Sequence, residues 1–314
     1  GGRIVDSAGA LEIDGLPRRL LVVGGGYVGL ELGTVYASLG SEVTLVEMTD
    51  RLLIGADRDL VRPLASRVEE LFEGVHLGTR VTELTQEDDV VRVRFEGDAP
   101  PEQEDYDRVL VAIGRRPRSQ ALGLEAAGVE TDDEGFIRVD ERRRTSEERI
   151  AAVGDVAGGM LLAHEAMHEG RVAAEAFAGE AAAFEPRAVP AVVYTDPQVA
   201  WCGLTEERAR QQDVEVRVTR SPWRASGRAL TLDAPKGMTK LLSAPRSGRI
   251  LGVGIVGRGA ESLIAEGALA IEMGAVVEDL ARSIAPHPTL SETLHEAAQS
   301  AMGCPLHLAP KGER

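Results

Sequence analysis

The sequence predicts an α/β protein with a parallel sheet in one domain and an antiparallel sheet in another. A buried strand at residues 19–23 is followed by a glycine loop, a helical stretch to Leu39 and a second strand at residues 42–47. This β–α–β order is typical of a parallel sheet. The last third instead holds several short strands, which favours antiparallel pairing. We therefore expect a Rossmann-like domain followed by an α+β domain.

Hydrophobic runs and turn residues predict the other elements of the first domain. Gly40 is expected to end the first helix as its C-cap. Gly114 closes a buried strand, and an acidic turn at residues 87–89 precedes another. We expect a polar loop at residues 98–105, a helix near residues 60–71, and strands at residues 75–84, 90–95 and 108–114.

The pattern changes after residue 118. Short apolar stretches at residues 136–139 and 150–155 precede an alanine-rich helix at about residues 162–177, and a linker follows at residues 180–190. Beyond it we expect strands at residues 191–194, 214–219, 238–243 and 250–256, and helices at residues 206–211, 261–273 and 289–302. The predicted division is an N-terminal segment (1–17), a nucleotide-binding domain (18–118), a central domain (119–184) and a last domain (185–314).

The composition excludes several classes of function. The 314 residues carry a formal net charge of −16, which argues against a nucleic-acid partner. No apolar run approaches the eighteen or so residues of a membrane span. Cys202 and Cys304 have neither the spacing of a metal site nor that of a disulfide framework, so we expect a reducing cytoplasm, with Cys202 a small core residue. His164 and His168 are one helical turn apart, but no third metal ligand accompanies them, and we predict no metal.

The glycine loop has the pattern of a dinucleotide-binding site. Gly24, Gly26 and Gly29 form Gly-x-Gly-x-x-Gly between a strand and a helix. The first glycine permits the tight turn, the second lets a pyrophosphate approach the backbone, and the third lets helix and strand pack closely. Glu47 ends the next strand, where a carboxylate accepts hydrogen bonds from ribose hydroxyls and repels a 2′-phosphate. We therefore expect NAD rather than NADP. The alternative is a glycine turn beside an exposed glutamate.

The segment at residues 287–292, His-Pro-Thr-Leu-Ser-Glu, has two interpretations. His287 and Glu292 suit an acid–base site in which the carboxylate holds the imidazole in one tautomer. The same residues form a capping box, with Thr289 as N-cap and Glu292 at the third helical position. We expect that one Glu292 side chain cannot serve both partners fully.

Several segments, in order along the chain, resemble the flavoprotein disulfide reductases, and their dihydrolipoamide dehydrogenase branch in particular. They are residues 24–33, 112–117, 153–156, 160–164, 221–229, 237–240 and 287–292. The resemblance implies an NAD-dependent enzyme, the E3 component of 2-oxo acid dehydrogenase complexes, that oxidises protein-bound dihydrolipoamide through a redox disulfide and FAD. It also implies a homodimer in which the last domain, the interface domain, completes the partner's active site.

The resemblance assigns roles residue by residue. His287 matches the base that takes a thiol proton, and Glu292 matches the carboxylate on its other ring nitrogen; His287–Pro288 is expected to be cis. Glu31 matches a carboxylate near the nicotinamide, although it also fits a solvent-facing helical position. The remaining cofactor-binding matches are Gly114 at the end of the nucleotide-domain strand, Asp155 against the flavin ribityl chain, and the backbone N–H of Ala163 against the flavin ring. Asp155 alone would also fit the end of a strand capping a turn.

The family pattern includes an N-terminal FAD domain with a Cys-x4-Cys pair, which this sequence does not contain. We therefore expect the C-terminal portion of a longer enzyme, with a central FAD-domain remnant, that binds NAD and dimerises but is catalytically incomplete and does not retain FAD. The alternatives are a stand-alone non-catalytic NAD-binding module, a glutathione-reductase-like enzyme or a soluble transhydrogenase. The acidic charge suggests docking to the basic subunit-binding domain of an E2 acyltransferase, which also carries the lipoyl domain. The sequence does not indicate which 2-oxo acid dehydrogenase complex such an enzyme would serve.

Overall fold

The computed structural model describes residues 2–98 and 102–308, which form two compact units. The first unit comprises residues 1–113 and 190–314, and the second comprises residues 114–189. Gly1 of the predicted N-terminal segment and residues 309–314 of the predicted last domain lie outside the described residues. Residues 99–101 of the predicted polar loop lie outside them too. None of the described helices is long and apolar enough to cross a membrane.

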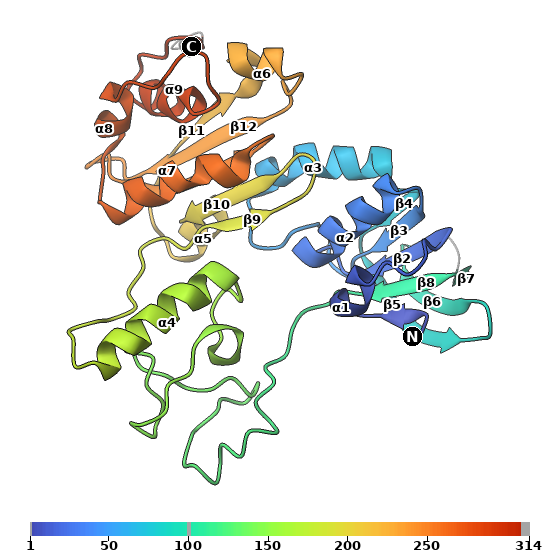
Figure 1. Ribbon diagram of the computed structural model, residues 1–314. Coiled ribbons are helices and arrows are strands. Elements are labelled where there is room, and N and C mark those ends of the chain that lie inside the picture. Colours follow the sequence, from blue (N-terminus) through green and yellow to red (C-terminus); the bar gives the residue numbers. More distant parts are fainter. Residues whose placement is uncertain (1, 99–101, 309–314) are drawn as a thin grey trace. The chain divides into compact units, whose positions relative to one another are not determined.

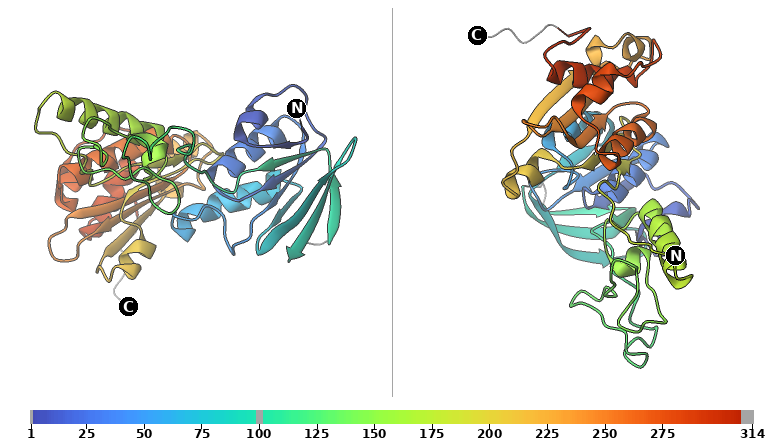
Figure 2. Two further views of the ribbon diagram at one scale, coloured as in Figure 1. Left: turned by 90° about the horizontal axis from the view of Figure 1, so that it is seen from below. Right: turned by 90° about the vertical axis from the view of Figure 1, so that its left-hand side faces the viewer.

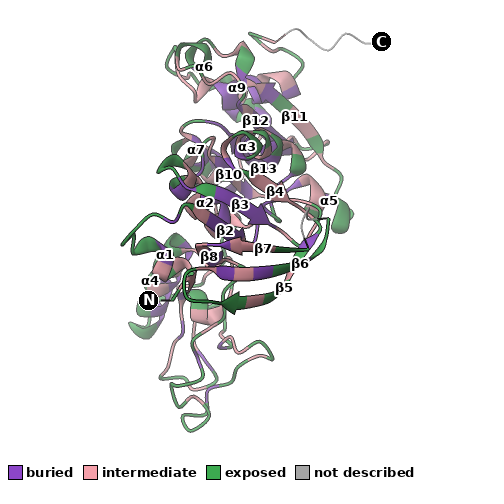
Figure 3. Ribbon diagram, turned by 90° about the vertical axis from the view of Figure 1, so that its right-hand side faces the viewer, coloured by how far each residue is buried: buried purple, intermediate pink, exposed green. Residues whose placement is uncertain are grey.

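The first unit begins with a parallel sheet of five described strands (Figure 1). Its spatial order is β1 (Ile4–Val5), β8 (Arg108–Val111), β2 (Arg19–Val23), β3 (Glu42–Val46) and β4 (Gly74–His76). Leu20, Leu21 and Val22 are at most 1% exposed because β2 is covered on both faces, and Figure 3 shows the buried residues along β2 and β3. The helices of this region are α1 (Ser7–Leu11), α2 (Tyr27–Ser38) and α3 (Arg58–Leu71).

A small antiparallel sheet adjoins the parallel one. It consists of β5 (Thr79–Gln86), β6 (Val91–Gly97) and β7 (Gln103–Tyr106), drawn in teal in Figure 2. Two predictions are wrong here. The strand expected at residues 75–84 is two strands, because Gly78 turns the chain with φ 61°. Part of the expected polar loop at residues 98–105 is β7, whose Tyr106 is buried against Phe95.

The rest of the first unit is a five-stranded antiparallel sheet with helices packed on it. The order is β11 (Arg217–Pro222), β12 (Met238–Ser243), β13 (Ile250–Val256), β10 (Val199–Gly203) and β9 (Ala191–Val193). The accompanying helices are α5 (Glu206–Gln211), the 3-10 turn η2 (Trp223–Ala225), α6 (Gly227–Thr231), α7 (Ala260–Glu272), α8 (Val277–Arg282) and α9 (Glu292–Ala301). The fold class is thus as predicted, although β10, with the buried Cys202, was not expected as a strand, and β11 begins at Arg217 rather than Val214.

One hydrophobic core joins the two large sheets of the first unit. It contains Leu45 and Leu60 from the nucleotide-binding region and Val193, Val199 and Val256 from the antiparallel sheet. The packing is close, since a Cβ added at Gly254 would lie 2.3 Å from Leu60 Cδ1. Burial of apolar side chains therefore holds α3 against β13.

The second unit has little regular structure. It contains α4 (Ala163–Phe177) and the 3-10 turn η1 (Gly154–Ala157). The apolar stretches at residues 136–139 and 150–155 form isolated bridges rather than described strands, with Ile137 opposite Thr131 and Ala151 opposite Arg144. A separate small core of Val129, Ile137 and Ala152 supports this unit.

Candidate functional site

The three glycines of the nucleotide loop differ in what surrounds them. A Cβ at Gly24, where φ is 111°, would lie 2.5 Å from the carbonyl oxygen of Ala112, and a Cβ at Gly29 would lie 2.1 Å from that of Gly24. Packing therefore requires glycine at both positions. Gly26, the N-cap of α2, has no such neighbour within 4 Å. The space beside Gly26, at a helix N-terminus, fits a pyrophosphate, which is the role predicted for this glycine.

Glu47 braces the glycine loop. Its Oε2 accepts the Gly25 N–H at 2.7 Å and its Oε1 accepts the Thr49 N–H at 2.8 Å. The carboxylate is half-buried, so the alternative of an exposed glutamate beside a glycine turn does not describe it. Because each carboxylate oxygen accepts more than one hydrogen bond, Glu47 retains acceptor capacity for ribose hydroxyls.

Glu31 lies on α2, one turn beyond the loop. Its Oε1 accepts the N–H of Tyr194, at the end of β9, at 2.8 Å. Burial raises the pKa of the Glu31 carboxyl above its ordinary value, while the Tyr194 hydrogen bond opposes that rise. Glu31 is therefore half-buried rather than solvent-facing, and its carboxylate bonds the backbone that follows β9 of the antiparallel sheet. The sequence did not reveal Tyr194, which is 163 residues away.

His287 and Glu292 form a bonded pair at the start of α9. His287 Nδ1 lies 2.8 Å from Glu292 Oε1, and Glu292 Oε2 accepts the Thr289 N–H at 2.7 Å. The expectation that Glu292 could not serve both partners is wrong, because each oxygen serves one. The helix begins at Glu292 with Ser291 as N-cap, so the prediction of Thr289 as N-cap is wrong too. The His287–Pro288 peptide is cis, as expected.

Hydrogen bonds account for the electrostatics of this pair. Burial opposes ionisation of Glu292, but the Thr289 N–H and His287 together hold the pKa of its carboxyl below the ordinary value. An ionised carboxylate only accepts hydrogen bonds, so it fixes the proton on His287 Nδ1 and leaves Nε2 as the basic nitrogen. The His287 side chain is 71% exposed, which leaves that nitrogen accessible.

A pocket opens beside this pair. His287, Glu292, Glu296 and His307 are its ionisable lining residues, and the others are small side chains such as Ser221 and Ser226. Neither Glu296 nor His307 was predicted. The only sequence signal is the spacing of Glu292 and Glu296, which puts both carboxylates on one face of α9.

The second unit holds the residues matched to the flavin. Asp155, in η1, accepts a hydrogen bond from Arg115 Nη1 at 2.7 Å, so the carboxylate is paired within this unit. Ala163 is exposed at the first position of α4, a helix N-terminus suited to a polar ring atom. Gly114 is exposed, with φ 125° and no neighbour within 4 Å of an added Cβ.

The structure groups the predicted residues into separate sites. Gly24, Gly26, Gly29 and Glu47 make one site at the carboxyl ends of β2 and β3, and Glu31 follows on α2. His287 and Glu292 make another beside the antiparallel sheet, where α9 packs on β11, β12 and α8. The glycine loop therefore follows a strand of the parallel sheet, whereas α9 packs on the antiparallel sheet (Figure 1).

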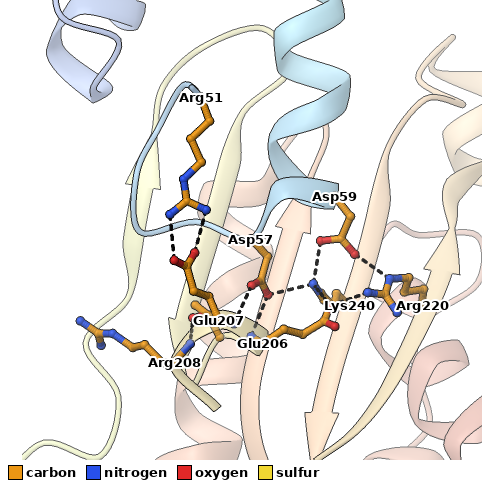
Figure 4. A network of polar contacts seen from close by, with 9 residues as sticks. Arg51, Asp57, Asp59, Glu206, Glu207, Arg208, Arg220 and Lys240 are labelled. Atoms are coloured by element: carbon orange, nitrogen blue, oxygen red, sulfur yellow. Dashed lines mark hydrogen bonds and ion pairs between the residues drawn. The ribbon is translucent and has the colours of Figure 1, made fainter. Parts of the chain in front are cut away.

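A charge network centred on the buried Lys240 connects α3 to the antiparallel sheet (Figure 4). Lys240 on β12 is 1% exposed, and its Nζ donates to Asp57 Oδ2 at 2.8 Å, to Asp59 Oδ1 at 2.6 Å and to Glu206. The three carboxylates lie close enough to share a cation, and the ammonium group occupies that position. Burial would raise the pKa of the Asp59 carboxyl, but Lys240 and Arg220 hold it below the ordinary value. Sequence reasoning missed this network, which joins α3 to the antiparallel sheet.

Comparison with protein families identifies the class. The model described as pyridine nucleotide-disulphide oxidoreductase matches residues 1–170, and the model of that family's dimerisation domain matches residues 189–298. The chain therefore belongs to the pyridine nucleotide-disulphide oxidoreductase family.

Curated proteins similar to this chain include dihydrolipoyl dehydrogenases. That of Vibrio cholerae is 46% identical over 298 residues, which are 95% of this chain and 62% of that protein. That of Haloferax volcanii is 48% identical over 303 residues, which are 96% of this chain and 64% of that protein. The chain thus spans less than two thirds of the length of these relatives.

Solved structures agree on the fold. The HOCl-induced flavoprotein disulfide reductase RclA from Escherichia coli has a TM-score of 0.85 at 28% identity, and the match covers 94% of this chain and 68% of that one. LpdA from Mycobacterium tuberculosis has a TM-score of 0.84 at 30% identity, covering 91% of this chain and 62% of that one.

Proposed function

We propose that this chain supplies the nucleotide-binding and acid–base parts of an NAD-dependent dihydrolipoyl dehydrogenase. The observation that carries the proposal is the His287–Glu292 pair, hydrogen-bonded at 2.8 Å and lining a pocket. The relatives' names support the choice of substrate, and the loop at Gly24, Gly26 and Gly29 supports the choice of cofactor. The substrate would be a dihydrolipoyl group carried by another protein.

His287 would act on the thiol of that substrate. The thiolate, not the thiol, is the nucleophile in disulfide exchange, so the reaction needs a base. His287 Nε2 would take the thiol proton while Glu292 keeps the other proton on Nδ1 and stabilises the imidazolium that forms. A positioned base of this kind contributes about 10²- to 10⁴-fold in rate.

The nucleotide would be NAD, held by the glycine loop. The pyrophosphate would lie over Gly26 at the N-terminus of α2, and Glu47 would accept hydrogen bonds from the ribose. Glu31 would lie near the nicotinamide. A carboxylate at position 47 disfavours the 2′-phosphate of NADP, which is the argument against a glutathione-reductase-like enzyme.

FAD would contact Asp155 and Ala163, and when bound it would carry electrons between a redox disulfide and NAD. The two cysteines of this chain do not suit that disulfide. Cys202 is buried, which raises the pKa of its thiol to about 12, and Cys304 is an exposed thiol; the two are not bonded to each other. We therefore propose that the redox disulfide comes from residues other than these two, and that this chain alone binds NAD without turning over lipoamide.

We also propose how the chain divides into functional domains and which proteins it binds. The segments are residues 1–17, a nucleotide domain (18–118), a central flavin-contacting domain (119–184) and an interface domain (185–314) that forms a homodimer, consistent with the match to the dimerisation-domain model. The net charge of −16 favours a basic partner such as an E2 subunit-binding domain. Such an association should weaken with salt, because screening reduces electrostatic steering.

Two assays test the proposal. The enzyme that contains this chain should reduce NAD with dihydrolipoamide and should be slow with glutathione disulfide and NADPH. Faster turnover with glutathione disulfide and NADPH than with dihydrolipoamide and NAD would support a glutathione-reductase-like enzyme. Hydride transfer between NADH and NADP without any thiol substrate would support a transhydrogenase. For the chain alone, NADH binding without flavin absorbance is expected, and flavin absorbance with lipoamide turnover would contradict the incomplete-chain proposal.

A further inference from the structure

Two histidine–glutamate pairs lie side by side on α9. Glu292 and Glu296 are four residues apart and therefore one turn apart on the same face of the helix. Glu292 Oε1 bonds His287 Nδ1 at 2.8 Å, and Glu296 Oε2 bonds His307 Nδ1 at 3.2 Å. Each carboxylate thus holds an imidazole through the same ring nitrogen, one from the segment before α9 and one from the segment after it.

Glu296 anchors the chain that carries His307. It is 5% exposed, and its Oε1 accepts the N–H groups of His307 at 2.8 Å and of Leu308 at 3.0 Å. With the imidazole included, one buried carboxylate accepts three hydrogen bonds from two consecutive residues. Hydrogen bonds to a charged acceptor are stronger than those between neutral groups. Residues 307 and 308 are therefore held in place against α9.

The two imidazoles line one pocket. His287 and His307 are among its lining residues, together with Glu292 and Glu296 and small side chains such as Ser226. Within residues 2–98 and 102–308, the Nε2 atoms of His287 and His307 have no hydrogen-bond partner. The His307 side chain is 45% exposed, so its ring can meet a ligand.

We propose that His307 is a second substrate-contacting imidazole of this pocket, placed there by Glu296, and that it makes the site selective for a dithiol. The inference rests on the proposed function, in which the pocket receives a dihydrolipoyl group. Such a substrate carries two thiols whose sulfur atoms are joined by a chain of three carbon atoms. His287 takes the proton of one thiol, and His307 Nε2 accepts a hydrogen bond from the other. A net hydrogen bond of about 0.5–1.5 kcal/mol corresponds to roughly a 2- to 10-fold change in affinity.

The first test needs no variant. In protein labelled with ¹³C-histidine, dihydrolipoamide is expected to shift the ring C–H signals of both His287 and His307. Dihydrolipoamide methylated on one sulfur should produce smaller shifts. His168, exposed on α4, serves as the control signal and should not move. A shift of His287 without a shift of His307 would overturn the second-imidazole inference while leaving the proposed function intact. No shift at either ring would reject the proposed function, and the inference with it.

Steady-state kinetics provide the second test. In the flavin-loaded enzyme, His307→Gln should raise KM for dihydrolipoamide about 2- to 10-fold and leave kcat near wild type, because a binding contact is lost rather than the base. Glu296→Gln should have the same effect through displacement of His307, and His168→Gln should have none. An unchanged KM in His307→Gln, with the fold intact by thermal melting, would contradict the proposal. A fall in kcat alone would also contradict it, because that would indicate a role in the chemical step.

Discussion

Glu292 bonds His287 with one carboxylate oxygen and the backbone of Thr289 with the other. The distances are 2.8 Å to His287 Nδ1 and 2.7 Å to the Thr289 N–H. A single side chain thus closes the turn that begins α9 and orients the imidazole that precedes it. The capping and catalytic interpretations of this segment are therefore compatible. The turn fixes the carboxylate, and the carboxylate fixes the tautomer.

Replacement of the base should separate activity from folding. In the enzyme that contains this chain, His287→Gln removes the proton acceptor from an exposed position. The kcat for dihydrolipoamide oxidation should therefore fall by about 10²- to 10⁴-fold while the melting temperature stays near wild type. Glu292→Gln should reduce both turnover and melting temperature, because it disturbs the base and the turn together. Normal lipoamide turnover by His287→Gln would remove the assignment of this residue as the base.

The glycine loop offers a matched pair of variants. Gly26→Ala adds a methyl group that meets no atom within 4 Å apart from its chain neighbours, and φ there is −79°. The protein should therefore fold normally but lose NADH affinity by at least tenfold. Gly29→Ala would put Cβ 2.1 Å from the Gly24 carbonyl oxygen. Its main effect should therefore be a lower melting temperature. Calorimetric titration with NADH and thermal melts distinguish the two effects. Unaltered NADH binding by Gly26→Ala would argue against a pyrophosphate at this position.

Neutralising Glu47 should affect nucleotide choice and loop stability together. Glu47→Gln keeps one oxygen for the Gly25 or Thr49 N–H and leaves the other donor without its acceptor, which costs about 1–3 kcal/mol if the donor stays buried. Loss of the negative charge should also reduce the ratio of the dissociation constant for NADPH to that for NADH. The ratio of the two dissociation constants is the measurement, with Glu42→Gln, on the exposed end of β3, as a control. An unchanged ratio would mean that Glu47 does not face the ribose.

The Lys240 network should control stability rather than catalysis. Lys240→Met removes the only cation that contacts the buried Asp57 carboxylate in the described part of the chain, whereas Arg220 still pairs with Asp59 and Glu206. The loss of this buried pair is expected to cost about 3–5 kcal/mol of unfolding free energy, measured by urea denaturation. Because the pKa of Asp59 is held below its unfolded value, the stabilisation it provides is present above that unfolded value and is lost as pH falls through the folded one. The wild type should therefore lose stability in acid more steeply than Asp59→Asn. Parallel acid profiles would contradict this role.

His295 should give the opposite pH dependence. Its Nε2 bonds Glu266 at 2.9 Å, which raises the pKa of the buried imidazole even though burial lowers it. A raised histidine pKa stabilises the fold below the unfolded pKa, about 6.5, and that stabilisation is lost as pH rises through the folded value. His295→Gln should therefore lower the melting temperature more at pH 6 than at pH 9. An equal loss at both values would show that the bond does not depend on charge.

The local features of this chain could be predicted from its sequence, because the interacting residues are close together along it. The glycine loop, the strands β12 and β13, and the helix α5 follow from short patterns of glycine, apolar and capping residues. His287 and Glu292 are five residues apart, so their pairing needed only the geometry of one turn. The apolar stretches at residues 136–139 and 150–155 could not be assigned from the sequence, because an apolar run does not indicate whether a neighbouring strand is available; the structure forms isolated bridges there.

The sequence alone thus determined the α/β class, the glycine loop between β2 and α2 and the presence of a histidine–carboxylate pair, since each is encoded within a few consecutive residues. Only the tertiary structure decided the contacts between distant residues. Tyr194 lies 163 residues from Glu31, and Lys240 lies 183 residues from Asp57. His307 meets Glu296 only because the chain folds back after α9. Sequence periodicity carries no information about such pairs, because it records which face of an element is buried and not which partner buries it.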